Sequence, residues 1–392
     1  MSPIDQGPNV GRRFPAEMTT WDDPHTGTTV RKVTDARCHD HHLYFTNPGW
    51  YDEGTKVLIS SDRTGRPNLF GVDLEDWDLV QLTDLPDLPP SEDRRERYPF
   101  PFLYTSVNPT HEEAYFWYEE VLVALDLENY TLRELWAAPD GYDVSITNVT
   151  ADGTAVCTSL TERLDVDRSA GYGGFEETWA ARPHSQVIEV PVNGGDPRVL
   201  HEEDYWIGHV NTSPTRADLL TFCHEGPWNR VDNRIWGLDR SSGDVWPIRE
   251  RTDEDETVGH EFWLADGEHI GYHGRTAAGE PLLGLTGFDD TDREETAVDQ
   301  HSWHFHAIDR QFVVGDGDRD TPFLLLYEWS EADVPVYRLA RHRGSWHTQQ
   351  LHVHPRLSPD GSEVLYTSDH LGYGDVYLAD VPDDIAALPR LE

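Results

Sequence analysis

The sequence predicts an all-β fold, a seven-bladed β-propeller that forms a single domain over residues 1–392. Segments that alternate apolar and polar residues recur along the chain, which is typical of half-buried strands. Each follows a turn rich in Pro, Asp or Gly, and the pattern repeats about every 45 to 60 residues, the length of a blade of four short strands. Only residues 383–390, "DDIAALPR", suggest a helical period.

Seven units follow one another along the chain. They begin at Tyr51, Pro109, Thr150, Pro214, Leu264, Ala307 and Ser358. The last unit is one strand short, and we expect the N-terminal segment 20–36 to supply that strand and close the ring. An open pair of β-sandwiches is the alternative, but the regular spacing favours the propeller.

An insertion over residues 160–184 interrupts the third unit. Connections of this length usually carry function or cover a pocket. A solvated surface excursion is the other interpretation, and the sequence leaves both open.

The charge of the chain restricts its partners. Asp and Glu number 73 against 31 Lys and Arg, which gives a net charge of −42, and Lys32 and Lys56 are the only lysines. An acidic, lysine-poor surface is typical of a salt-accumulating halophile, where salt screens the self-repulsion; an ordinary acidic protein is the alternative. This charge argues against nucleic acid or an anionic membrane as a partner.

The cysteines and the apolar runs bear on the compartment. Cys38, Cys157 and Cys223 are far apart and form no CxxC pair, so a reducing compartment is the better interpretation. We find neither a signal-peptide core nor a run of about 18 apolar residues, and therefore expect a soluble, cytoplasmic protein.

Histidines recur just ahead of the first strand of several units. They are His41, His42, His209, His260, His304, His306, His352 and His354. Because the innermost strands of propeller blades begin at one mouth of the channel, we expect these imidazoles to converge. His352 and His354 are two residues apart and would point to the same side of a strand, within reach of one metal ion. Imidazole with the amide of Gln349 suits Mn, Fe, Ni or Zn.

Several stretches together resemble one known family. They are "CHEGPWNRVDNRIW" (223–236), "GHEFWLADG" (259–267), "VVGDG" (313–317) and "QQLHVHPRLSPDGSEVLYTSD" (349–369). They are similar to the oligogalacturonate lyases, seven-bladed propellers of the polysaccharide lyase class, and the resemblance covers nearly the whole chain. It implies a carbon–oxygen lyase that cleaves short oligogalacturonides, which are anionic oligosaccharides, by β-elimination to 4,5-unsaturated uronates. A non-catalytic propeller that binds or scaffolds a partner is the alternative.

The resemblance also implies roles for individual residues. A divalent ion, typically Mn²⁺, would be held by Gln349, His352, His354 and a further histidine, for which we favour His304 over His306. The catalytic base would be His260, and the catalytic arginine Arg234. A neutral imidazole suits a general base near neutral pH, and a cation beside the substrate carboxylate stabilises the charge that develops when the α proton leaves.

Four more histidines are candidates for substrate binding. The family has a basic residue where this chain has Asp40; either His41 and His42 replace that cation or the substrate differs. His209 and His224 would either line the pocket or have structural roles.

Overall fold

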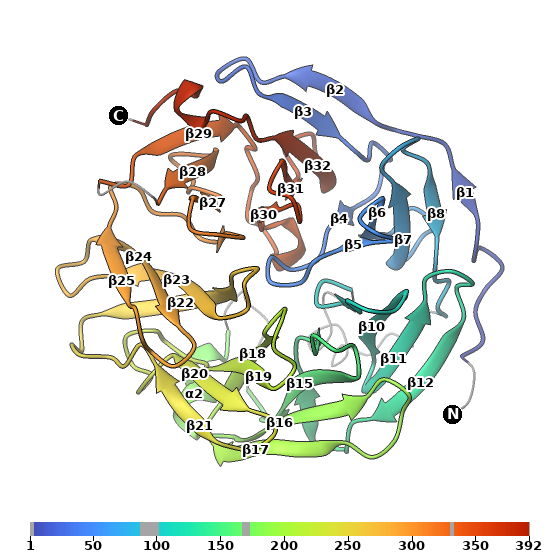
Figure 1. Ribbon diagram of the computed structural model, residues 1–392. Helices are drawn as coiled ribbons and strands as arrows, with labels where there is room; N and C mark the ends of the chain where they lie inside the picture. Colours follow the sequence, from blue (N-terminus) through green and yellow to red (C-terminus); the bar gives the residue numbers. More distant parts are fainter. Residues whose placement is uncertain (1–3, 87–101, 167–172, 330–332, 392) are drawn as a thin grey trace. The chain divides into compact units, whose positions relative to one another are not determined.

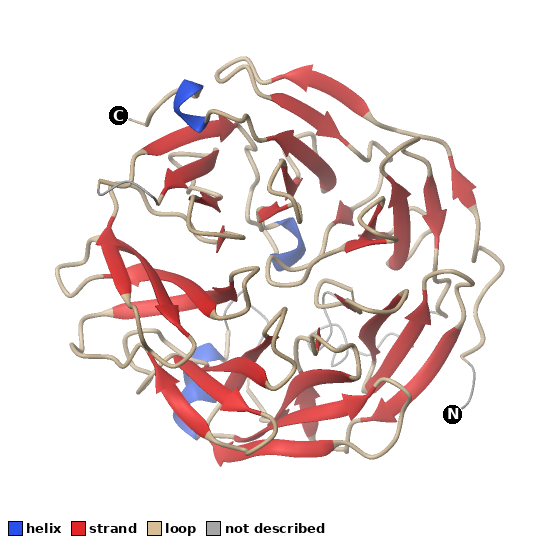
Figure 2. Cartoon of the chain, in the orientation of Figure 1, coloured by secondary structure: helices blue, strands red, loops and turns tan. Residues whose placement is uncertain are grey.

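The computed structural model describes residues 4–86, 102–166, 173–329 and 333–391 (Figure 1). Within these residues the strands form seven antiparallel sheets, the number of blades that the sequence predicts. Strands and loops make up nearly the whole chain (Figure 2). The described helices are α2 (Phe175–Ala181) and the single turns η1 (Gln349–Leu351) and η2 (Ile385–Ala387), the last within the segment of expected helical period. The all-β, seven-bladed fold class is confirmed.

The contacts divide the chain into two compact units, each described here by itself. The first unit is Met1–Asp5 with Leu88–Ala297, and the second is Gln6–Asp87 with Val298–Glu392. No helix in the described part of either unit is long and apolar enough to cross a membrane.

The first unit contains four sheets, which follow one another in chain order. The first comprises β9 (Ser106–Val107), β10 (Glu113–Tyr118), β11 (Val121–Asp126) and β12 (Leu132–Ala137). The second comprises β13 (Tyr142–Val144), β14 (Asn148–Val149), β15 (Ala155–Glu162), β16 (His184–Pro191) and β17 (Arg198–Asp204). The third comprises β18 (Ile207–Thr212), β19 (Leu219–His224), β20 (Ile235–Asp239) and β21 (Val245–Ile248). The fourth comprises β22 (Thr257–Trp263), β23 (His269–Arg275), β24 (Pro281–Gly287) and β25 (Glu294–Ala297).

The second unit contains three sheets. One comprises β1 (Arg13–Phe14), β4 (Asp40–His41), β5 (Trp50–Tyr51), β6 (Lys56–Ser61), β7 (Asn68–Asp73) and β8 (Leu79–Gln81). Another comprises β26 (Phe305–His306), β27 (Phe312–Gly315), β28 (Leu324–Glu328) and β29 (Val336–Ala340). The last comprises β2 (Thr19–Asp22), β3 (Thr29–Lys32), β30 (Arg356–Leu357), β31 (Glu363–Ser368) and β32 (Asp375–Asp380).

The apolar cores lie between successive sheets. In the first unit, Tyr115 and Leu122 of one sheet pack in a single cluster with Val156 and Ile188 of the next. The central strands are buried on both faces, as the four consecutive buried residues of β11 show. This packing explains the apolar runs in the middle strands, because each sheet is covered by its neighbours.

The two ends of the second unit's chain meet in one sheet. β3 pairs antiparallel with β32, with Val30 opposite Ala379, and so supplies the strand that the last repeat lacks, as predicted (Figure 1). β2 adds a further strand outside β3, which the sequence did not predict.

The described part of the 160–184 insertion is folded against the first unit. β15 ends at Glu162, α2 spans Phe175–Ala181, and β16 begins at His184; residues 167–172 lie outside the described part. The indole nitrogen of Trp179 donates to the hydroxyl of Tyr205 at 3.2 Å, and the guanidinium of Arg230 lies 4.3 Å from the Trp179 ring centroid. These contacts hold α2 in place.

We predict that Val30→Ala destabilises the second unit by about 2 kcal/mol, because the Val30 side chain is buried in the core that β3 shares with β31 and β32. Urea unfolding followed by circular dichroism measures this change. Thr20→Ala, on the exposed face of β2, is the matched control and should change the unfolding free energy by less than about 0.5 kcal/mol. Equal effects of the two changes would argue against a stabilising role for the pairing of β3 with β32.

Candidate functional site

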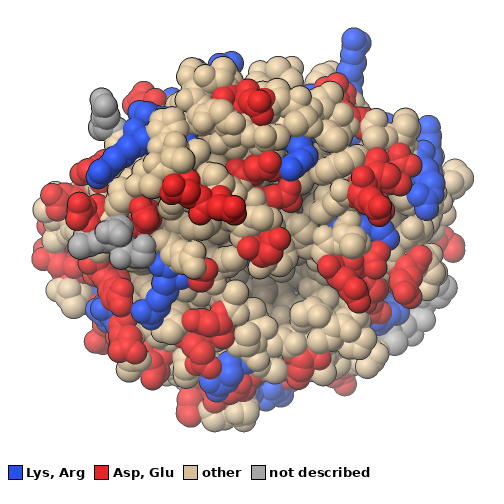
Figure 3. Space-filling model, turned by 45° about the horizontal axis from the view of Figure 1, so that its top comes forward, with Lys and Arg blue, Asp and Glu red and all other residues tan. Residues whose placement is uncertain are grey.

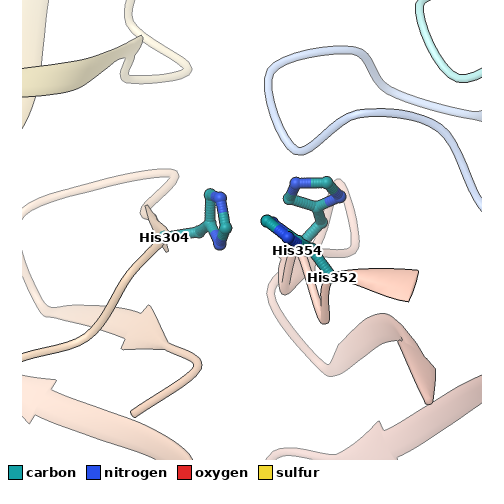
Figure 4. Close-up of side chains that lie close together, drawn as sticks. All are labelled: His304, His352 and His354. Atoms are coloured by element: carbon teal, nitrogen blue, oxygen red, sulfur yellow. The ribbon is translucent and has the colours of Figure 1, made fainter. Parts of the chain in front are cut away.

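Three histidines of the second unit lie together. His304, His352 and His354 each offer a ring nitrogen, and these atoms all lie within 4.8 Å of one another. The ring centroid of His304 is 4.4 Å from that of His354 and 5.4 Å from that of His352. The three rings face one another (Figure 4).

The backbone that brings His352 and His354 together is not the strand that their spacing predicted. His352 is the residue that ends η1, and His354 has a left-handed backbone with φ 45° just before β30. We expected the pleat of a strand to place both rings on the same side. Instead, the turn between η1 and β30 directs both rings toward His304.

The orientation of His304 is set by Asp316. The Nδ1 atom of His304 lies 2.7 Å from Oδ2 of Asp316, whose Oδ1 accepts hydrogen bonds from the backbone amides of Trp303 and His304. A carboxylate on Nδ1 favours the tautomer with the proton there and leaves Nε2 as the ligand atom.

The donor set fits a divalent transition metal. Oε1 of Gln349 and Nδ1 of His352 are buried atoms without a hydrogen-bond partner among the described residues. Burial of such acceptors without a partner costs about 1–3 kcal/mol each, which a cation would offset. Burial also lowers the pKa of His352 to about 4, so that its ring is neutral, as a ligand must be. Three imidazoles and an amide oxygen suit a borderline ion.

His306 is not part of this group. Its side chain is buried on β26, and its Nδ1 accepts a hydrogen bond from the backbone amide of Leu357 at 3.2 Å. Of the two alternatives left open by the sequence, the geometry therefore favours His304.

His41 and His42 are buried in the second unit, and burial lowers their pKa values to about 4 and about 3. Neither ring is therefore a cation near neutral pH, which corrects the expectation that they replace the basic residue absent at Asp40. Nδ1 of His42 lies 2.7 Å from the hydroxyl of Thr367, and its Nε2 donates to the carbonyl of His354 at 2.8 Å. His42 thus stabilises the backbone at His354, a candidate metal ligand. Both of its ring nitrogens have hydrogen-bond partners within the protein, so neither is available to bind substrate.

In the first unit, His209 and His260 lie in equivalent β-bulges of two successive sheets. The pairing of β18 with β19 shifts register between Gly208 and Asn211, and that of β22 with β23 shifts between Gly259 and Phe262. His209 and His260 lie inside these bulges with φ 47° and 50°. Their ring centroids are 6.3 Å apart. Bulges of this kind re-aim a side chain and are frequent beside active sites.

His260 is oriented by a second histidine. Its Nδ1 lies 3.0 Å from Nε2 of His273, which is buried on β23. The rings of Trp228 and His260 meet edge to face, with centroids 5.0 Å apart. Sequence reasoning missed both neighbours, because they come from other segments of the unit.

Arg234 is only 3% exposed and is held by carboxylates. Its Nη1 donates to Oε1 of Glu225 at 2.7 Å, and its Nε lies 3.8 Å from Oε2 of Glu261. Burial works to raise the pKa of Glu225, but Arg234 and His209 outweigh burial and keep it well below its usual range. Glu225 is therefore ionised.

Glu261 is fully buried, and its carboxyl oxygens have no hydrogen bond among the described residues. Burial raises its pKa, against the effect of Arg234. One sequence signal could have found it: in the matching bulges, "GHE" at Gly259 corresponds to "GHV" at Gly208, so Glu261 stands where the preceding sheet has Val210.

A second group, His209, Cys223 and Glu225, also has ligand atoms within 4.8 Å of one another. Burial raises the pKa of the Cys223 thiol well above its usual value, so it is not a thiolate. Because Arg234 already neutralises Glu225, a further cation is unfavourable here.

His224 has both ring nitrogens engaged by carboxylates, with Asp232 at 2.6 Å from Nδ1 and Glu203 at 2.9 Å from Nε2. Its ring stacks on Tyr205 at a centroid distance of 3.8 Å. Neither nitrogen remains to bind substrate, so the geometry favours the structural role for His224.

A family model described as oligogalacturonate lyase matches residues 9–385. The chain belongs to this family. It is 26% identical to an oligogalacturonide lyase of Pectobacterium atrosepticum and 24% identical to an oligogalacturonate lyase of Dickeya dadantii. Each alignment covers 96% of this chain and 99% of the relative.

Two solved structures of the family share the fold. An oligogalacturonate lyase in complex with manganese matches with a TM-score of 0.86 and 23% identity, covering 96% of this chain and 99% of the other. An oligogalacturonate lyase from Vibrio parahaemolyticus matches with a TM-score of 0.85 and 25% identity, covering 96% of this chain and 100% of the other. The similarity extends over nearly the full length in each case.

We predict that His352→Ala abolishes tight binding of a divalent transition metal, and that Asp316→Asn weakens it about 10–100-fold by loosening His304. Titration of metal-free protein by calorimetry measures the affinity. His347→Ala, an exposed histidine five residues before His352, is the control and should bind normally. Unchanged affinity in His352→Ala would exclude the proposed ligand set.

We predict that His224 contributes stability that is lost as pH rises. Burial opposes its protonation, but hydrogen bonds with Asp232 and Glu203 prevail and raise its pKa. The stabilisation is therefore complete below the unfolded value of about 6.5 and disappears as pH rises through the higher folded value. Urea unfolding across this range should show the advantage of wild type over His224→Gln shrinking with pH. The half-exposed His184→Gln is the control, and a difference that grows with pH would contradict the prediction.

Proposed function

We propose that the protein cleaves short oligogalacturonides by metal-dependent β-elimination and releases products with a 4,5-unsaturated uronate. The observation that carries this proposal is the group of three imidazoles whose ring nitrogens lie within 4.8 Å of one another, in a chain of the oligogalacturonate lyase family. Oε1 of Gln349, three residues before His352, is buried without a hydrogen-bond partner among the described residues and supports Gln349 as a fourth ligand. A related structure of the same fold contains manganese, and we infer Mn²⁺ or a similar divalent ion here.

The residues that would hold the ion are His304, Gln349, His352 and His354. When bound, the ion supplies a Lewis acid for the carboxylate of the uronate and stabilises the negative charge that develops there. The need for this is chemical, because the proton at C5 is α to a carboxylate and is a very weak acid while that group keeps its full charge.

We assign the removal of the C5 proton to His260. Its Nδ1 is oriented by His273 at 3.0 Å, so Nε2 is the atom that would accept the proton. As the C5 proton moves to His260, the electron pair of the C5–H bond forms the C4–C5 double bond and the C4–O4 bond breaks. O4 leaves with the departing sugar and takes up a proton from water. The left-handed backbone at His260 supports this role, since strain of this kind concentrates at functional positions.

We assign Arg234 the stabilisation of the developing charge. The ion pair with Glu225 keeps the guanidinium in one orientation, and burial strengthens its field, because little water screens it. Among the histidines, we keep His209 as a substrate contact, since it lies beside His260 and Glu225. We propose His41 as a further substrate contact.

We also infer that the protein works in the cytoplasm of a salt-accumulating cell. The net charge of −42 with two lysines supports this, as do three cysteines that are buried and free. The same charge argues against nucleic acid or an anionic membrane as the partner. To test this inference, formation of the unsaturated product is measured at rising salt concentration. Turnover that persists at salt concentrations that inactivate an ordinary enzyme would support it.

We predict that His260→Ala lowers kcat on digalacturonate by about 10²–10⁴-fold, the usual contribution of a general base. The ultraviolet absorbance of the unsaturated product follows turnover, in high salt, with Mn²⁺ present or removed by a chelator. Removal of the ion should abolish turnover in wild type, and its return should restore it. His269→Ala, a half-exposed histidine of the same unit, is the control. Full activity of His260→Ala would reject its role, and no turnover of any oligouronide by wild type would favour a non-catalytic binding protein.

A further inference from the structure

The first unit contains a cavity of about 320 Å³ that extends from His209 and Glu225 to the insertion. Its walls come from β13, from β18 and from the insertion, through Gly173, Gly174, Phe175 and Thr178. A volume of this size lies at the lower end of ligand pockets, about 300–1,000 Å³. We propose that this cavity is a sugar subsite that prefers an uncharged, methyl-esterified galacturonosyl residue over the free acid. The proposal rests on the proposed function, since it concerns a neighbouring residue of the same substrate chain.

The apolar lining suits a sugar ring. Phe175 of α2 and Trp206 are half-buried, and their rings meet edge to face with centroids 5.1 Å apart. Tyr104 and Ile146 add to the same cavity. Aromatic rings offer flat apolar surfaces on which the C–H face of a pyranose, or the methyl group of an ester, can pack.

The polar lining offers acceptors rather than cations. Asp143 and Glu225 supply carboxylates, and Ser145, Thr161 and Thr178 supply hydroxyls. Each carboxylate already pairs with an arginine, Asp143 with Arg163 at 2.8 Å and Glu225 with Arg234 at 2.7 Å. Among the described residues that line the cavity there is no lysine or arginine. Sugar hydroxyls can donate to these acceptors.

The same lining disfavours a free uronate. A substrate carboxylate in the cavity would lie beside the carboxyl groups of Asp143 and Glu225, while their partners Arg163 and Arg234 are not among the lining residues and so offer it no contact. An ester carries no such charge and keeps every hydroxyl. The charge pattern therefore selects the neutral form of the sugar.

The cavity adjoins the residues assigned to the reaction. Glu225 lines the cavity and holds Arg234, and His209 lines it with its ring 6.3 Å from that of His260. A sugar in the cavity would therefore contact the side chains that position the base and the arginine. The cavity is therefore positioned to hold the sugar unit next to the one whose glycosidic bond is cleaved.

The described part of the insertion, from Gly173 onward, is held by several contacts and forms one wall of the cavity. The hydroxyl of Thr178 donates to the carbonyl of Gly174 at 2.7 Å, and Arg182 stacks on Tyr205 at 3.9 Å. Together with the bond from Trp179 to Tyr205, these contacts hold Phe175 against Trp206. The interruption of the third unit thus has a function: it completes the subsite.

The experiment compares trigalacturonate with trimers that carry one methyl ester at a single residue, using the metal-loaded enzyme. We expect wild type to cleave one of these esters with a kcat/KM at least equal to that of the free acid. Phe175→Ala should lower kcat/KM for that ester roughly three- to tenfold, the contribution of one aromatic contact. Phe288→Ala, a half-buried aromatic residue of the same unit that does not line the cavity, should leave it unchanged.

A second variant tests the charge argument without removing an aromatic side chain. Asp143→Asn removes one carboxylate and should raise kcat/KM for the free acid relative to the ester. Slower cleavage of every ester than of the free acid by wild type would overturn the subsite, while turnover of the free acid would leave the proposed function intact. If wild type turned over neither, calorimetric binding of the esters to wild type and Phe175→Ala would still decide: equal affinities reject the subsite.

Discussion

The arrangement of the candidate residues depends on a backbone conformation that histidine seldom adopts. His209, His260 and His354 have φ 47°, 50° and 45°, in the left-handed region, which costs a non-glycine residue about 1–2 kcal/mol. Two of them lie in bulges that follow a glycine, and the third lies between η1 and β30. In a regular strand these rings would follow the pleat. The sheets' cores stabilise the fold enough to hold each strained residue, and the strain aims the imidazole.

The second constraint is a buried charge balance in the first unit. Arg234 lies between Glu225, which is ionised, and Glu261, whose pKa burial raises. If both carboxylates were charged, the cluster would carry a net negative charge and would repel a uronate. Burial favours the neutral form of Glu261, which leaves Glu225 as the main carboxylate opposing the charge of Arg234. Glu261 stands where the matching bulge has the apolar Val210, and it brings a second carboxyl group to 3.8 Å from Nε of Arg234.

The sequence was sufficient for features that repeat or lie close together along the chain. Alternating strands and regular turns predicted the seven sheets, and the pairing of residues near Val30 with the last repeat followed from a missing strand. The spacing of His352 and His354 predicted that they meet, although a turn rather than a strand brings them together. Contacts between distant segments could not be predicted. The choice of His304 depends on Asp316, and the bracing role of His42 depends on the carbonyl of His354, 312 residues away.

The charge of the whole chain explains why recognition has to be local. Asp and Glu cover more of the face drawn in Figure 3 than Lys and Arg do, and a net charge of −42 repels an anionic sugar chain at long range. At molar salt the Debye length falls to about 3 Å, so this repulsion is confined to contact distance. Recognition then depends on contacts with individual groups. At the proposed metal site, imidazoles and the ion would bind a substrate carboxylate. In the cavity of the first unit, aromatic rings and carboxylates paired with arginines would bind a sugar whose carboxylate is esterified. A subsite that prefers an ester fits this protein, because each esterified residue removes one charge that an acidic surface would otherwise oppose.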